Sequence, residues 1–215
     1  MSYDSQVFLG DKIDNGLNIG CQLVGTCFRE PYINLDFNVK RYLENWQTKM
    51  HDGTKPIYFT VADATKLPFR DEVFDEVYSS HLLEHFNFGF TIPILREWFR
   101  VLRVGGKIKV CVPDFEWDVK LYRGEVKYKN YVSKGLLCYM DDGTLVGRNA
   151  PIFAGVYGNT SNTDSQVIDH KMIFDKKLFE WILPLAGFKN VANAKMKCCP
   201  YPDIRGGDLC VVATK

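Results

Sequence analysis

Short apolar runs alternate with longer segments of helical spacing along most of this chain. The apolar runs predict seven short strands, at residues 17–19, 32–35, 57–61, 76–79, 107–112, 190–196 and 209–214. Apolar positions three or four residues apart predict helices at residues 39–50, 92–102, 115–122 and 176–185. Apolar strands that alternate with helices are typical of an α/β fold built around a mainly parallel sheet.

Residues that start and stop helices refine two of these elements. Thr91 is expected to cap helix 92–102, and Gly105–Gly106 to end it before the next strand begins. Asp175 is the expected N-cap of helix 176–185, which should stop at Gly187. The last two strands flank the turn-rich stretch "CCPYPDIRGG", so one of them is predicted to be antiparallel.

The length of 215 residues suits a single domain spanning 1–215. Residues 123–174 show no clear period and are predicted to form either a lid or an ordered surface insertion. The formal net charge of +1 gives no electrostatic reason to expect nucleic acid or a membrane surface as a partner. No apolar run approaches the ~20 residues that span a bilayer, and the N-terminal residues do not resemble a signal peptide.

The seven cysteines are odd in number and contain no CxxC pair. This usage predicts a reduced, cytoplasmic protein without a structural zinc site.

Two aspartates follow neighbouring predicted strands. Asp36 ends "YINLD", and Asp63 follows the next strand in "FTVADATKLPF". Ligands of open parallel sheets bind beyond the carboxyl ends of the strands. There, Asp36 could accept hydrogen bonds from a ribose diol, and Asp63 or its neighbouring backbone could bind a purine amine, with Ala64 leaving room for the ring. Taken singly, each aspartate is better explained as an ordinary turn or cap residue.

The stretch "LPFRDEVFDEVYSSHLLEHF", followed by "LREWFRVLRVGGKIKVCVPDF", resembles the class I S-adenosylmethionine-dependent methyltransferases in order and spacing. The closest likeness is to the methyltransferase type 11 group, and it covers about residues 17–115. A later stretch, "HKMIFDKKLFEWILPLAGFKNV", resembles the ending of the smaller members. The residues on the family pattern are Phe74–Asp75, Leu83–Glu84–His85, Glu97, Arg100–Val101–Leu102 and Gly105–Gly106.

The resemblance implies a Rossmann-like, doubly wound, mainly parallel sheet with an antiparallel C-terminal strand, which binds S-adenosylmethionine across its carboxyl edge. It also implies structural roles for Phe74–Asp75, Arg100 and the paired glycines. The cofactor contacts that it implies are Gly20, Cys21 and Gln22 at the methionine part, Asp36 at the ribose, Asp63 and Ala64 at the adenine, and Ser79 and Ser80 between cofactor and acceptor.

The glycine loop departs from the family. Members usually carry G–x–G there, because a missing side chain lets the backbone approach the ligand and permits positive φ. Here the loop reads Gly20–Cys21–Gln22, with Gly25 three positions further on. Three interpretations remain open: Gly25 serves a displaced turn, the Gln22 amide meets the methionine carboxylate, or the pocket is obstructed.

Two histidines are candidates for catalysis. His81 follows the fourth predicted strand, nearest the expected methyl position, and is the candidate general base. His170 follows Asp169, either as a base with its orienting carboxylate or as an anchor for the insertion. The spacing of His81, Glu84 and His85 would also fit a divalent metal, as in the glutamate–histidine patch of some quinone-type methyltransferases. Because His81 stands where those enzymes have a glutamate, we expect no metal site.

The sequence therefore predicts a methyltransferase that acts on a small-molecule or sugar-like acceptor, at oxygen. The chain has no (D/N)PP(Y/F) tetrad, which together with its near-neutral charge argues against a nucleic acid substrate. One alternative is a non-catalytic, methyltransferase-like binding or scaffold protein whose cofactor loop is degenerate at Gln22. An NAD-type oxidoreductase is disfavoured because a full G–x–G–x–x–G is missing.

Overall fold

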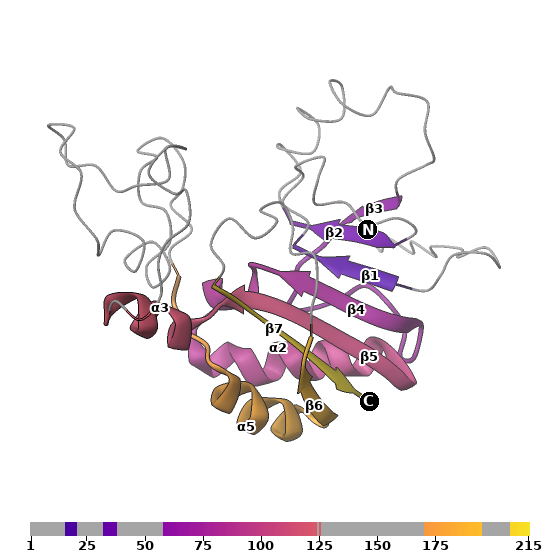
Figure 1. The fold of residues 1–215 in the computed structure, drawn as a ribbon. Coiled ribbons are helices and arrows are strands. Elements are labelled where there is room, and N and C mark those ends of the chain that lie inside the picture. The colour runs from indigo at the N-terminus through magenta and orange to yellow at the C-terminus, as the bar shows by residue number, and fades with distance from the viewer. Residues whose placement is uncertain (1–15, 21–31, 38–57, 124, 126–169, 195–206) are drawn as a thin grey trace, which may run out of the picture.

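The computed structural model describes residues 16–20, 32–37, 58–123, 125, 170–194 and 207–215. The strands among them form a single seven-stranded sheet (Figure 1). The strand order across the sheet is β3-β2-β1-β4-β5-β7-β6. The strands are β1 (Gly16–Ile19), β2 (Ile33–Asp36), β3 (Tyr58–Val61), β4 (Phe74–Ser80), β5 (Leu102–Pro113), β6 (Lys189–Asn193) and β7 (Asp208–Thr214).

The direction of the strands confirms the predicted topology. Strands β1 to β5 are parallel to one another, whereas β7 is antiparallel to both β5 and β6. From β1, the chain adds β2 and β3 on one side and β4 and β5 on the other, so the order reverses between β1 and β4. Such a reversal is the switch point beside which ligands of open α/β sheets bind.

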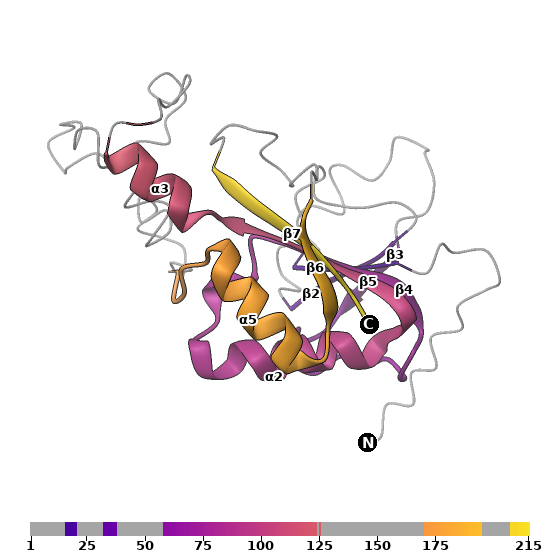
Figure 2. The ribbon, with the colours of Figure 1, turned by 60° about the horizontal axis from the view of Figure 1, so that its bottom comes forward.

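Two helices, α2 (Phe88–Val101) and α5 (Lys176–Ala186), pack against each other on one face of the sheet, under β5 and β7 (Figure 2). A shorter helix, α3 (Phe115–Tyr122), follows β5 with the predicted bounds, and the 3-10 turn η1 (Leu83–His85) precedes α2. The apolar faces of α2 and α5 are fully buried and complete the core; they contribute Ile94, Leu95, Trp98, Phe179, Ile182 and Leu183. Among the described helices, none has the length and apolar character needed to cross a membrane.

Helix α5 begins and ends as predicted. The Asp175 Oδ1 atom accepts a hydrogen bond from the Leu178 N–H at 2.7 Å, which is the expected N-cap. Gly187 ends the helix in the left-handed conformation, with φ of 108°.

The predicted limits of α2 are wrong at both ends. Thr91 lies inside the first turn, and its hydroxyl donates to the Asn87 carbonyl at 3.4 Å, while Asn87 occupies the N-cap position. Pro93 suggested a start at residue 92 because proline favours the first helical turn, but the helix accommodates it in the second. At the other end, Leu102 already has extended backbone, so Gly105–Gly106 lie within β5 instead of ending the helix.

The paired glycines instead fit a tight start to β5. Gly105 has φ of +81°, and a Cβ atom on Gly106 would lie 2.8 Å from the Arg103 carbonyl oxygen. The structural role that the family resemblance implied for these glycines agrees with this packing. The predicted helix 39–50, the end of strand 190–196 and most of segment 123–174 lie outside the described residues.

A partly buried hydrogen-bond network explains the spacing of two family motifs. The Arg100 guanidinium donates to both carboxylate oxygens of Glu97, at 2.7 and 2.9 Å. It also donates to the carbonyls of Leu67 and Phe69 and to the Asp71 carboxylate. Because Glu97 additionally accepts from the Leu67 N–H at 2.8 Å, the network fastens the loop after Ala64 to α2.

This network makes acid stability depend on Glu97. Hydrogen bonds from Arg100 lower the pKa of Glu97, and together with the Leu67 N–H they outweigh the effect of burial. A carboxyl whose pKa is lowered by folding stabilises the folded state above its unfolded pKa, and this contribution is lost as the pH falls through the folded value. We expect the stability difference between the wild type and Glu97→Gln to be largest above the ordinary value of 4.5 and to shrink in more acidic solution.

Urea unfolding from neutral pH down to about pH 3 measures that difference. The control is Glu180→Gln, which removes an exposed carboxylate that pairs with Lys176 on α5. A Glu97→Gln difference that stays constant down to the acid limit would contradict the prediction.

Candidate functional site

The carboxyl ends of β1, β2 and β3 are joined by backbone hydrogen bonds. The Gly20 N–H donates to the Leu35 carbonyl at 2.8 Å, and the Ala62 N–H donates to the Asp36 carbonyl at 3.1 Å. Three of the predicted positions, at Gly20, Asp36 and the turn after β3, therefore share one edge of the sheet.

Gly20 has a conformation that favours glycine. Its φ is +74°, and a Cβ atom would lie 2.7 Å from Leu82 Cδ2. This conformation is compatible with the predicted turn, whose later residues lie outside the described part of the chain. Cys21 and Gln22, the two other predicted contacts of this loop, lie outside the described residues, so the three interpretations of Gln22 stay open.

Apolar side chains flank Asp36 at this edge. Asp36 itself is half-buried, whereas Phe37 is 69% exposed and Val61, at the end of β3, is 45% exposed. A polar acceptor between exposed apolar groups is the combination that a nucleoside needs, because its sugar is polar and its base is flat and largely apolar.

Asp63 and Ala64 form a turn whose contacts the sequence did not reveal. The Asp63 Oδ1 atom accepts from the Thr65 N–H at 2.8 Å, so one of its two carboxylate oxygens holds the turn itself. Ala64 is buried, and its carbonyl accepts from the Trp98 indole N–H at 2.9 Å. The turn is thereby attached to α2 both through Trp98 and through the Arg100 network.

Ser79 and Ser80 end β4, next to β1 at the switch point. Both side chains are buried, and within the described part of the chain neither hydroxyl has a hydrogen-bond partner. Buried hydroxyl groups usually have a hydrogen-bond partner. A bound polar ligand is one explanation for two serine hydroxyls that lack one here.

His81 follows directly and has a strained backbone, with φ of +52°. Its N–H donates to the Cys111 carbonyl of β5 at 2.9 Å. The ring lies between two carboxylates: Nδ1 is 3.4 Å from Glu84 Oε1, and Nε2 is 3.6 Å from Asp208 Oδ2. Burial alone would lower the pKa of His81, but Asp208 and Glu84 together raise it to about 9.

Glu84 is the centre of a larger histidine group. Its side chain is 1% exposed, and the His170 Nε2 atom lies 3.9 Å from its Oε1 atom. The rings of His85 and His170 are 5.0 Å apart between centroids. Burial would raise the pKa of Glu84, but the hydrogen bond and charge of His81, with the charges of His85 and His170, lower it.

The structure thus brings both predicted catalytic histidines to the same carboxylate. The His81 Nδ1 and His170 Nε2 atoms both approach the Oε1 atom of Glu84, at 3.4 and 3.9 Å. Asp169, the residue proposed from sequence as the partner of His170, lies outside the described residues.

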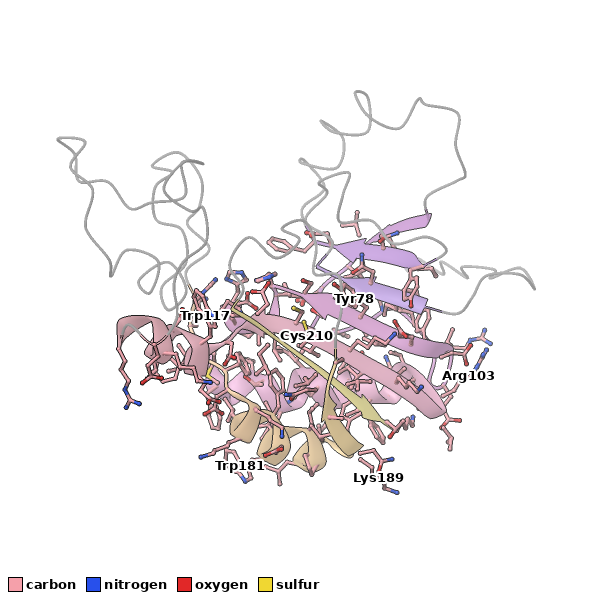
Figure 3. The ribbon with its side chains drawn as sticks, in the orientation of Figure 1. Tyr78, Arg103, Trp117, Trp181, Lys189 and Cys210 are labelled. Atoms are coloured by element: carbon pink, nitrogen blue, oxygen red, sulfur yellow. The ribbon has the colours of Figure 1, made fainter. Side chains whose placement is uncertain are left out.

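Asp208 is the site residue that the sequence reading missed. It starts β7, and because β7 runs antiparallel to β5, its start lies at the carboxyl end of β5. Figure 3 shows this end of the sheet beside Trp117, opposite the end that carries Arg103. The signal was present in "RGGDLCVV", since a carboxylate at the start of a predicted antiparallel strand must lie at the ligand edge.

Part of the chain matches the model of a known protein family. Residues 18–110 match the family model described as a methyltransferase domain. No curated protein matches the chain at a significant level.

Solved structures with the same fold include a S-adenosylmethionine-dependent methyltransferase from Methanosarcina mazei. That chain is 18% identical, with a TM-score of 0.56 over 95% of this chain and 93% of the other. A putative S-adenosylmethionine-dependent methyltransferase from Listeria monocytogenes is 15% identical, with a TM-score of 0.57 over 96% and 93%. A putative methyltransferase from Haloferax volcanii, solved with the activator Trm112, is 13% identical, with a TM-score of 0.54 over 96% and 84%.

Proposed function

We propose that the chain is a class I S-adenosylmethionine-dependent methyltransferase that transfers a methyl group to an oxygen atom of a small molecule or glycan precursor. The match of residues 18–110 to a methyltransferase domain model supports this proposal. The family match and the fold indicate S-adenosylmethionine as the cofactor. The observation that supports the proposal most is the convergence of Gly20, Asp36 and the Asp63 turn at one edge of the sheet, joined by backbone hydrogen bonds.

The residues present fit this cofactor. Asp36 would accept hydrogen bonds from the ribose hydroxyls, and Val61 and Phe37 offer apolar surface beside it. Asp63 and Ala64 would contact the adenine, and Gly20, with Cys21 and Gln22, the methionine part. The unpaired hydroxyls of Ser79 and Ser80 are suitable partners for polar cofactor atoms.

We propose that the acceptor lies on the β4 and β7 side of the cofactor, against His81. The sulfonium of the cofactor is an activated methyl donor, so alignment of the acceptor accounts for much of the rate. An acceptor hydroxyl must also lose a proton. Because its pKa is raised to about 9, His81 already holds a proton at neutral pH, so the acceptor's proton would go to the neighbouring Asp208 carboxylate, which His81 orients. His170 acts as a positioning residue through its contact with Glu84.

Binding of S-adenosylhomocysteine, measured by titration calorimetry, tests the cofactor site. We expect micromolar affinity for the wild type and about 10- to 100-fold weaker binding for Asp36→Asn, because that change removes charged hydrogen bonds to the ribose. The matched control is Asp75→Asn, since Asp75 pairs with Arg103 far from this edge, and its affinity should not change.

Failure to detect heat at millimolar ligand would favour the alternative of a non-catalytic protein with a degenerate loop. The acceptor is tested separately, by incubating the protein and methyl-labelled cofactor with pools of phenols, alcohols and nucleotide sugars and, in parallel, with amines, proteins and nucleic acids. Label that appears only in nitrogen compounds, proteins or nucleic acids would overturn the small-molecule oxygen acceptor and leave the cofactor site intact.

A further inference from the structure

Glu84, His85 and His170, called here the Glu84 cluster, bring one carboxylate and two imidazoles together. One potential ligand atom from each residue lies within 4.8 Å of the other two. The residues come from two separate segments, because Glu84 and His85 belong to η1 and His170 precedes α5. Sequence spacing had grouped Glu84 and His85 with His81 instead.

The Glu84 carboxylate is buried, and its cationic neighbour, His81, lies 3.4 Å from one of its two oxygens. Its side chain is 1% exposed, and neither oxygen accepts a hydrogen bond of good geometry from the described residues. An ionised carboxylate removed from water costs several kcal/mol unless it is paired or bound to a cation. Unlike the exposed Glu180 of α5, Glu84 therefore needs positive charge beside it, to which His81 contributes and a bound cation would add.

The backbone holds the cluster in place. The Glu84 carbonyl accepts hydrogen bonds from the N–H groups of Lys171 and Met172, at 2.8 and 3.1 Å. The same segment is fixed at its other end, where the Phe174 carbonyl accepts from the Phe115 N–H at 2.9 Å. The approach of His170 to Glu84 is therefore built into the fold and does not depend on the side chains alone.

The donor set suits a particular class of ion. Two imidazole nitrogens and one carboxylate oxygen are the ligands of many catalytic zinc sites, which keep a fourth position open. Zinc binds such ligands at about 2.0–2.2 Å, so the side chains must draw together slightly from their present separation. His81 Nδ1, 3.4 Å from Glu84 Oε1, is placed to orient the carboxylate as an outer partner.

We propose that Glu84, His85 and His170 bind one divalent transition metal ion, with Zn²⁺ as the best match. This proposal replaces the expectation from sequence that the chain has no metal site. It is independent of the proposed function, because metal binding is measured without cofactor or acceptor.

A neighbouring group, His81, Cys111 and Asp208, also meets the distance criterion for a metal. Its geometry is less suitable, because the Cys111 sulfur lies 2.7 Å from the Cys210 sulfur across β5 and β7. The His81 ring also faces two carboxylates that already balance its charge. Substitution of Cys111, which belongs only to the second group, distinguishes the two groups experimentally.

The experiment uses the full chain without a histidine tag, stripped with a chelator and titrated with Zn²⁺ against a chromophoric competitor. We expect one Zn²⁺ per chain, binding at least about tenfold weaker in Glu84→Gln and in His85→Ala, and no measurable site in the double variant His85→Ala/His170→Ala. Circular dichroism and thermal unfolding establish that each variant is folded. Because His85 is half-buried, its substitution should disturb the fold least. Glu180→Gln on α5 is the control and should bind as the wild type does.

Substitution with Co²⁺ gives a second readout. A site with nitrogen and oxygen ligands should show visible absorption without the near-ultraviolet charge-transfer band of a thiolate ligand, and Cys111→Ser should leave the spectrum unchanged. The proposal is overturned if the wild type binds no Zn²⁺, if the double histidine variant binds as tightly as the wild type, or if only Cys111→Ser weakens binding.

Discussion

Replacement of Trp98 with alanine is expected to lower the free energy of unfolding by about 3–5 kcal/mol, the usual cost of removing a large buried aromatic side chain. Trp98 is fully buried in the core between α2 and the sheet. Its indole N–H also satisfies the carbonyl of Ala64 at 2.9 Å, so the substitution leaves both a cavity and an unpaired buried acceptor. Because Ala64 lies in the proposed adenine turn, affinity for S-adenosylhomocysteine should fall as well.

Urea unfolding measures the stability of this variant, and Trp181→Ala is the matched control. Trp181 is 55% exposed on α5 and stacks on Phe88, so its loss should cost less than about 1 kcal/mol. The Trp98→Phe variant keeps most of the apolar volume but not the N–H group. Its loss in the free energy of unfolding should lie between those of Trp98→Ala and Trp181→Ala. Equal losses for Trp98→Ala and Trp181→Ala would contradict the packing described for α2.

The second large effect is expected at Arg100. Arg100→Ala should lower the free energy of unfolding by about 2–4 kcal/mol, because several charged hydrogen bonds are lost and Glu97 is left without its cation. The guanidinium contacts Glu97, Asp71 and the carbonyls of Leu67 and Phe69 at once. A lysine at this position cannot reproduce the paired contact with Glu97, so Arg100→Lys should recover only part of the loss.

Arg103→Ala provides the comparison for this prediction. Arg103 forms an ion pair with Asp75 in which both side chains are largely exposed, and such pairs contribute less than about 1 kcal/mol. Thermal and urea unfolding of both arginine variants, measured side by side, should separate them clearly. If Arg103→Ala destabilises the protein as much as Arg100→Ala does, the network around Glu97 is not what fixes the loop.

Most of the fold could be predicted because its helices and strands depend on residues that are close together in the sequence. Apolar runs marked the strands, and Asp175 and Gly187 marked the ends of α5, since capping depends on residues within one turn of each other. The limits of α2 failed where two local signals competed. Pro93 favoured a later start, and the glycines after Arg103 favoured a later end than the chain adopts.

The site could be predicted only in part, for a related reason. Strand ends on a parallel sheet meet by topology, so positions such as Asp36 follow from strand order alone. The partners of their side chains cannot be predicted from strand order, because contacts such as that of Trp98 with Ala64 or of Glu84 with His170 join distant segments. Asp208 lies on the last strand, and its proximity to His81 depends on the reversed direction of that strand.

The reversal of strand order between β1 and β4 divides this edge into two parts of different origin. The groups proposed for the nucleoside come from β1, β2, β3 and the turns that follow them. The groups proposed to face the acceptor, including His81, Glu84 and Asp208, come from β4, η1 and β7 and the residues next to them. Selectivity for a new acceptor could therefore evolve, or be engineered, by changes on one side of the boundary while the machinery that recognises the methyl donor is inherited intact.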